Sequence, residues 1–77
     1  MKGLFLHGVN CTSRIWSQVR EHLAGIDADY VEYPHAVTAA ANCVSDITKW
    51  VFGEFGSNHY DFVVGHSMGG IIALELA

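Results

Sequence analysis

The sequence predicts an α/β fold built on a parallel β-sheet, because three short apolar segments alternate with three segments of helical periodicity. Each apolar segment is closely followed by a glycine or a proline, as is typical of a buried strand that ends in a turn. Hydrophobic residues make up 51% of the 77 residues and charged residues 16%, which supplies enough apolar surface for a packed core. We therefore expect a single small domain over residues 1–77, with helices on both faces of the sheet.

The first strand and helix are expected within the first 25 residues. The apolar run "LFL" (4–6) stands between glycines in "GLFLHG" and predicts a strand. Thr12 and Ser13 are candidate N-caps for the following helix, and Gly25 is its expected stop. The helix has one apolar stripe, which consists of Ile15, Trp16, Val19 and Leu23.

The second strand and helix occupy the middle of the chain. "ADYVEY" (28–33) predicts a strand that ends at Pro34, because proline cannot continue a ladder of backbone hydrogen bonds. A longer helix is expected from about Thr38 to Phe52. Its apolar face consists of Ala40, Cys43, Val44, Ile47, Trp50 and Val51.

The third strand and helix reach the end of the sequence. "YDFVVG" (60–65) predicts a strand, and "MGGIIALELA" (68–77) predicts a helix directly after it. This helix ends without a glycine, a basic residue in its last turn or a proline, which are the usual stop signals. We therefore expect residues 1–77 to be the N-terminal segment of a larger domain, truncated after this helix.

Charge and composition exclude several classes of function. The formal net charge is −4, and the four Lys and Arg residues are too scattered to bind successive phosphates of a nucleic acid. No apolar run approaches the roughly 18 to 20 residues that span a bilayer, and no export signal is present, so we expect a cytoplasmic protein without a membrane span. Cys11 and Cys43 are expected as free thiols. The sequence lacks metal-ligand spacing, a phosphate-binding loop and a dinucleotide fingerprint, so neither a metal nor a cofactor is expected.

The pattern Gly65-x-Ser67-x-Gly69 indicates a catalytic nucleophile, because it follows a predicted strand and precedes a predicted helix. In such a turn the serine adopts a strained backbone that lifts its hydroxyl clear of the sheet, and the flanking glycines avoid a collision of side chains. The N–H of Met68, at the positive end of the helix, would face a developing oxyanion. The alternative is that Ser67 only caps the helix.

Two segments resemble the N-terminal part of the α/β-hydrolase superfamily, which includes serine esterases, lipases and related acyl-transfer enzymes. "LFLHG" (4–8) resembles the strand and oxyanion loop of that family, and "FVVGHSMGG" (62–70) resembles its nucleophile elbow. The resemblance implies a partial α/β-hydrolase fold with strand order 2-1-3. It implies Ser67 as the nucleophile and the N–H groups of Met68 and Val9 as oxyanion donors. The residues expected to support the elbow and the oxyanion loop are Gly65, His66, Gly69, His7 and Gly8.

The same resemblance implies a catalytic acid and then a histidine base after the serine. After Ser67 the sequence has one acid, Glu75, and no histidine, so the triad is incomplete within residues 1–77. His35 follows the second strand on the correct side of the sheet but is expected to lie too far from the serine. His22 and His59 are expected to be solvated or structural. The segment "EYPHAVTAA" (32–40) also departs from the family's usual turn.

These observations lead to two hypotheses. The first is a serine hydrolase that acts on an ester or similar acyl bond of a small molecule and is inactive as residues 1–77 alone. The second is a non-catalytic α/β module that self-associates through the exposed edge of its third strand. The expected partner is the C-terminal portion of the domain under the first hypothesis and a second copy of the chain under the second.

Overall fold

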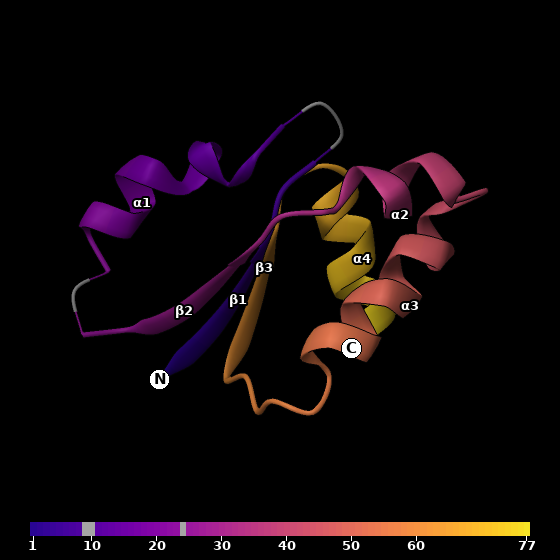
Figure 1. The fold of residues 1–77 in the computed structure, drawn as a ribbon. Coiled ribbons are helices and arrows are strands. Elements are labelled where there is room, and N and C mark those ends of the chain that lie inside the picture. Colours follow the sequence, from indigo (N-terminus) through magenta and orange to yellow (C-terminus); the bar gives the residue numbers. More distant parts are fainter. Residues whose placement is uncertain (9–10, 24) are drawn as a thin grey trace.

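The computed structural model describes residues 1–8, 11–23 and 25–77, and these residues form a three-stranded parallel sheet flanked by helices (Figure 1). The strand order is β2-β1-β3, which confirms the predicted α/β fold and its order 2-1-3. The strands are β1 (Lys2–Leu6), β2 (Asp27–Val31) and β3 (Phe62–Gly65). The helices are the 3-10 helix η1 (Ser13–Trp16) and the α-helices α1 (Ser17–Glu21), α2 (His35–Ala40), α3 (Val44–Phe55) and α4 (Met68–Leu76).

The register of the sheet brings the carboxyl ends of all three strands to one edge. Leu6, the last residue of β1, is aligned with Val31 of β2 and with Gly65 of β3. The chain segments that leave these strands therefore start side by side. Ligands bind at this kind of edge in open α/β sheets, because neighbouring connections there turn to opposite faces.

The two faces of the sheet are covered by different helices (Figure 1). On one face Phe5 packs edge-on against Trp16 at 5.2 Å between ring centroids and stacks on Tyr30 at 4.9 Å. The other face carries the main apolar core against α3 and α4, because alternate residues of β1 point that way. This core consists of Leu4, Leu6, Val31, Ile47, Val51, Met68 and Ile72.

The prediction of a single helix from Thr38 to Phe52 is wrong, because two helices occupy this region. The chain leaves α2 at Ala41, whose ψ of 131° is extended, and Cys43 is also extended before α3 begins. The Asn42 N–H donates to Asp46 Oδ2 at 2.8 Å, which satisfies a backbone donor in the break. Cys43 is exposed at this N-cap position and does not lie on an apolar helical face as expected.

The first helical segment also differs from its prediction. Thr12 is the N-cap, as predicted, since its hydroxyl accepts a hydrogen bond from the Arg14 N–H at 3.2 Å. Only Trp16 of the predicted stripe is buried, whereas Ile15 and Val19 are each 39% exposed. The segment begins with a tighter 3-10 turn, and neither side chain belongs to the main apolar core. Within the described residues, no helix has the length and apolar character needed to cross a membrane.

Candidate functional site

Ser67 lies in the turn between β3 and α4 in a strained backbone conformation. Its φ is 57° and its ψ is −118°, and no other non-glycine residue of the described chain has a positive φ. Such a conformation costs about 1–3 kcal/mol and persists where the surrounding structure enforces it. Ser67 is exposed, and its side chain makes no capping hydrogen bond to α4. Ser67 thus occupies the N-cap position of α4, but its hydroxyl does not cap the helix.

Two glycines allow the backbone to approach itself closely at this turn. A Cβ on Gly65 would overlap the Gly69 backbone, and a Cβ on Gly69 would overlap the carbonyl oxygen of Leu6. The His66 N–H donates to the same Leu6 carbonyl at 3.0 Å, which continues the pairing of β3 with β1 up to the turn. The glycines at both ends of the Gly-x-Ser-x-Gly pattern are thus required by packing, as the sequence predicted.

The Met68 N–H is available to a ligand. Met68 is the first residue of α4, and the next two N–H groups, of Gly69 and Gly70, donate to the His66 and Ser67 carbonyls at 3.0 and 2.9 Å. The Met68 N–H has no hydrogen-bond acceptor among the described residues. An unpaired donor at the positive end of a nine-residue helix attracts negative charge.

Gly8 lies beside Ser67, on the segment that leaves β1. A Cβ on Gly8 would stand 2.9 Å from Ser67 Cβ and 3.5 Å from its Oγ. The ends of β1 and β3 therefore meet at the serine, as expected from the predicted order of the strands. Val9, the second predicted oxyanion donor, lies outside the described residues.

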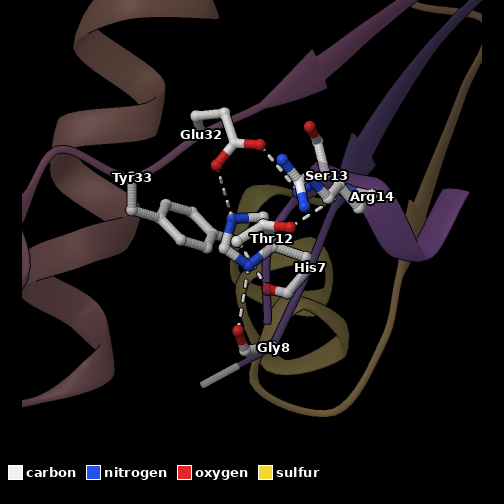
Figure 2. A network of polar contacts seen from close by, with 7 residues as sticks. All are labelled: His7, Gly8, Thr12, Ser13, Arg14, Glu32 and Tyr33. Carbon is white, nitrogen blue, oxygen red and sulfur yellow. Dashed lines mark hydrogen bonds and ion pairs between the residues drawn. The ribbon is translucent and has the colours of Figure 1, made fainter. Parts of the chain in front are cut away.

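A network of polar contacts holds the segment around His7 and Gly8 against the end of β2 (Figure 2). The His7 ring is buried, and its Nδ1 lies 2.9 Å from the Gly8 carbonyl oxygen. The Tyr33 hydroxyl donates to the His7 carbonyl at 2.9 Å, and the two rings lie 4.4 Å apart. Burial raises the pKa of Tyr33 to about 12, so this hydroxyl keeps its proton at neutral pH.

Glu32 completes this network from the opposite side of the His7 ring (Figure 2). Its Oε1 accepts a hydrogen bond from the Ser13 N–H at 2.7 Å, and its Oε2 lies 3.7 Å from His7 Nε2. Hydrogen bonding from Ser13 is the main cause that lowers the pKa of Glu32; desolvation opposes it, and the nearby His7 and Arg14 lower it further. Glu32 is therefore ionised at neutral pH.

No sequence pattern predicted Glu32, Tyr33 or Ser13 as site residues. The predicted second strand extended to Tyr33, but β2 ends at Val31. Glu32 and Tyr33 therefore leave the ladder and reach the His7 segment. The sequence signal that could have identified them is their position directly after the strand predicted to pair with "LFLHG", since ligands bind at the carboxyl ends of such strands.

A cavity of about 400 Å³ is lined by neighbours of Ser67, whereas Ser67 itself is not among its described lining residues. Gly8, which lies against Ser67, and Met68, which follows Ser67 in the sequence, both line this cavity. This volume is within the range of pockets for small molecules. The remaining lining residues are His7, Cys11, Thr12, Glu32, Tyr33, His35, Thr38 and Ile47.

No imidazole within the described residues hydrogen-bonds to Ser67. The His7 ring bonds to the Gly8 carbonyl, and His59 Nε2 pairs with Asp61 Oδ1 at 3.4 Å. His66 is exposed directly after β3 and does not line the cavity. His35 lines the cavity and is exposed, and His22 and His59 are exposed outside it. No group of three or more potential metal ligands occurs in the part of the chain that the structure describes.

Comparison with known proteins adds no family assignment. The chain matches no protein-family model, no curated protein and no solved structure.

Proposed function

We propose that Ser67 is the nucleophile of an acyl-transfer site of the α/β-hydrolase type, which acts on an ester or similar acyl bond of a small molecule. The observation that carries this proposal is the backbone of Ser67, with φ 57° and ψ −118° in a strand-to-helix turn. Protein structures retain such strain at functional sites, where it presents a reactive group. A serine needed only for helix capping gains nothing from this conformation, because its hydroxyl does not bond to the helix.

The neighbouring groups support the same chemistry. Attack on a carbonyl places negative charge on its oxygen, and the unpaired Met68 N–H at the start of α4 supplies a donor for that charge. The cavity lined by Gly8 and Met68 supplies a place for the acyl or alcohol group of the substrate.

We propose that the general base and its carboxylate partner come from residues other than 1–77. A serine hydroxyl becomes an efficient nucleophile when a base accepts its proton. No imidazole within the described residues hydrogen-bonds to Ser67. The chain on its own is thus expected to present the nucleophile without activating it.

A Ser67→Cys variant tests the nucleophile without the missing base, because a thiol ionises far more readily than a hydroxyl. The variant is made in a background with Cys11→Ala and Cys43→Ala, so that it carries a single thiol. A matched control places the thiol in an exposed turn by Ser57→Cys. Acylation by p-nitrophenyl acetate is followed by release of nitrophenolate and by the mass of the acylated protein.

We expect the thiol at position 67 to be acylated at least about tenfold faster than the control thiol, since one well-placed oxyanion donor contributes factors of about 100 or more in enzymes. Equal rates for the two thiols would contradict the assignment of position 67 as a nucleophile site.

A second candidate function is self-association as a non-catalytic module, and the surface of β3 and α4 favours it. β3 pairs with β1 on one side, and within the described sheet its other edge has no partner strand. Val63 is 37% exposed on this strand, and Ile71 and Leu74 of α4 are 50% and 79% exposed. An apolar edge of this kind is a template for pairing with another strand.

A further inference from the structure

Two hydroxyls in the lining of the cavity beside Ser67 act as acceptors towards a ligand, and the Met68 N–H is the donor assigned above to the oxyanion. The Tyr33 hydroxyl donates its proton to the His7 carbonyl, and the Thr38 hydroxyl donates its proton to the His35 carbonyl at 3.1 Å. A hydroxyl has one proton, so both groups present only lone pairs to a ligand in the cavity.

Glu32 adds a charged acceptor to the same lining. Its Oε1 already accepts from Ser13, but its Oε2 lies 3.7 Å from His7 Nε2, which is beyond hydrogen-bonding distance. The side chain of Glu32 is 55% exposed, so Oε2 is accessible to a ligand. The described lining contains no lysine or arginine to neutralise this carboxylate within the cavity.

From these contacts we infer that the cavity binds a cationic group rich in N–H donors, of which a primary ammonium is the simplest, and that the acyl substrate of Ser67 carries such a group. An ammonium has three donors and no acceptor. It would bond to Glu32 Oε2 and to the lone pairs of Tyr33 and Thr38. The substrate part of this inference rests on the proposed function, whereas the binding part does not.

The binding part is tested on the unmodified chain by nuclear magnetic resonance. n-Butylammonium is titrated at about pH 8, where histidine side chains are ordinarily neutral, and n-butanol serves as the uncharged probe. We expect saturable shifts of the Ser13 and Met68 amide signals with n-butylammonium at about millimolar concentrations, and much smaller shifts with n-butanol. Equal responses to the two probes would overturn the inference.

A charge-matched pair of variants assigns the binding to Glu32. Glu32→Gln removes the carboxylate from the cavity, whereas Glu54→Gln removes an exposed carboxylate from α3, outside the lining. We expect n-butylammonium binding to weaken about tenfold with Glu32→Gln, the usual size of one charge-assisted hydrogen bond. Binding should be unchanged with Glu54→Gln. Equal weakening by both variants would mean nonspecific attraction to a negative protein.

The substrate part is tested in the single-thiol Ser67→Cys variant with two esters. They are the p-nitrophenyl esters of 6-aminohexanoic acid and of heptanoic acid, which differ by an ammonium in place of a methyl group. We expect the ammonium ester to acylate the thiol about tenfold faster, and the ratio of the two rates to approach one when Glu32→Gln is added. A change that merely disturbs the site lowers both rates and leaves their ratio intact.

The two proposals fail in different ways. If n-butylammonium binds but neither ester acylates the thiol, the cationic site stands and the acyl-transfer function is contradicted. If both esters acylate the thiol at equal rates, the nucleophile stands and the cationic specificity is contradicted.

Discussion

Gly69, in the first turn of α4, lies directly against the carbonyl of Leu6 at the end of β1, so that a Cβ at position 69 would overlap the Leu6 oxygen. This contact fixes where α4 begins relative to the central strand. Because Ser67 immediately precedes α4, the contact also sets the position of the serine above the sheet. A small residue thus connects the packing of the core with the geometry of the candidate site.

Gly69→Ala is expected to destabilise the fold by about 1–3 kcal/mol or more, because the new methyl group forces α4 away from β1. Gly53→Ala is the matched control, since Gly53 lies within α3 and a Cβ there meets nothing within 4 Å. It is expected to stabilise by about 0.5–1 kcal/mol through higher helix propensity. Urea unfolding measures both free energies. A neutral Gly69→Ala would contradict the close contact.

The hydrogen bond from Tyr33 to His7 predicts a loss of stability in alkaline solution. Burial raises the pKa of Tyr33 to about 12, from about 10 in the unfolded chain. The protonated phenol is therefore favoured by folding, and its contribution to stability is complete below about pH 10 and decreases as the pH rises towards 12. The free energy of unfolding between these pH values should fall less in a Tyr33→Phe variant. An identical fall in both proteins would contradict this role.

The lowered pKa of Glu32 predicts a loss of stability in acidic solution. Hydrogen bonding from Ser13 lowers the pKa of Glu32 below its ordinary value of 4.5, so the carboxylate form is favoured by folding. This contribution is present above pH 4.5 and is lost as the pH falls through the lower folded-state pKa. The difference in unfolding free energy between wild type and Glu32→Gln should therefore shrink as the pH falls below 4.5. A difference independent of pH would show that the charge of Glu32 contributes nothing.

Residues 1–77 on their own are expected to hydrolyse p-nitrophenyl acetate no faster than the Ser67→Ala variant does. The physical reason is the absence of a hydrogen-bonded imidazole at Ser67 among the described residues. Nitrophenolate release measures the rate. A burst of release that disappears in Ser67→Ala would contradict this prediction and show that a base is available within the chain.

The exposed edge of β3 predicts concentration-dependent self-association. Val63→Lys places a charge on this edge, which natural sheets use to prevent pairing between strands. We expect the wild-type chain to sediment as a dimer or larger assembly and Val63→Lys to shift it towards the monomer. Ile15→Lys, on the exposed side of η1, is a control that changes the same charge away from the edge. A monomeric wild type would contradict the second candidate function.

The sequence predicted the elements that depend on local pattern. Apolar runs ending at glycine or proline marked all three strands, and "GHSMGG" marked the turn at Ser67, because strand burial and turn geometry leave direct signals in neighbouring residues. The boundaries of the helices were predicted less accurately. The apolar spacing of residues 38–52 suggested one helix, but periodicity does not reveal that Asn42 bonds to Asp46 and that the chain is extended at Cys43.

By itself the sequence determined the α/β alternation and the serine between a strand and a helix, since both are consequences of short-range spacing. Only the tertiary structure decided which distant groups surround that serine. The register of β1 and β2 brings Glu32 and Tyr33 to His7, and the register of β1 and β3 brings Gly8 to Ser67. Such contacts join residues about 25 to 60 positions apart, and no local pattern records them, because strand pairing and not sequence spacing sets their distance.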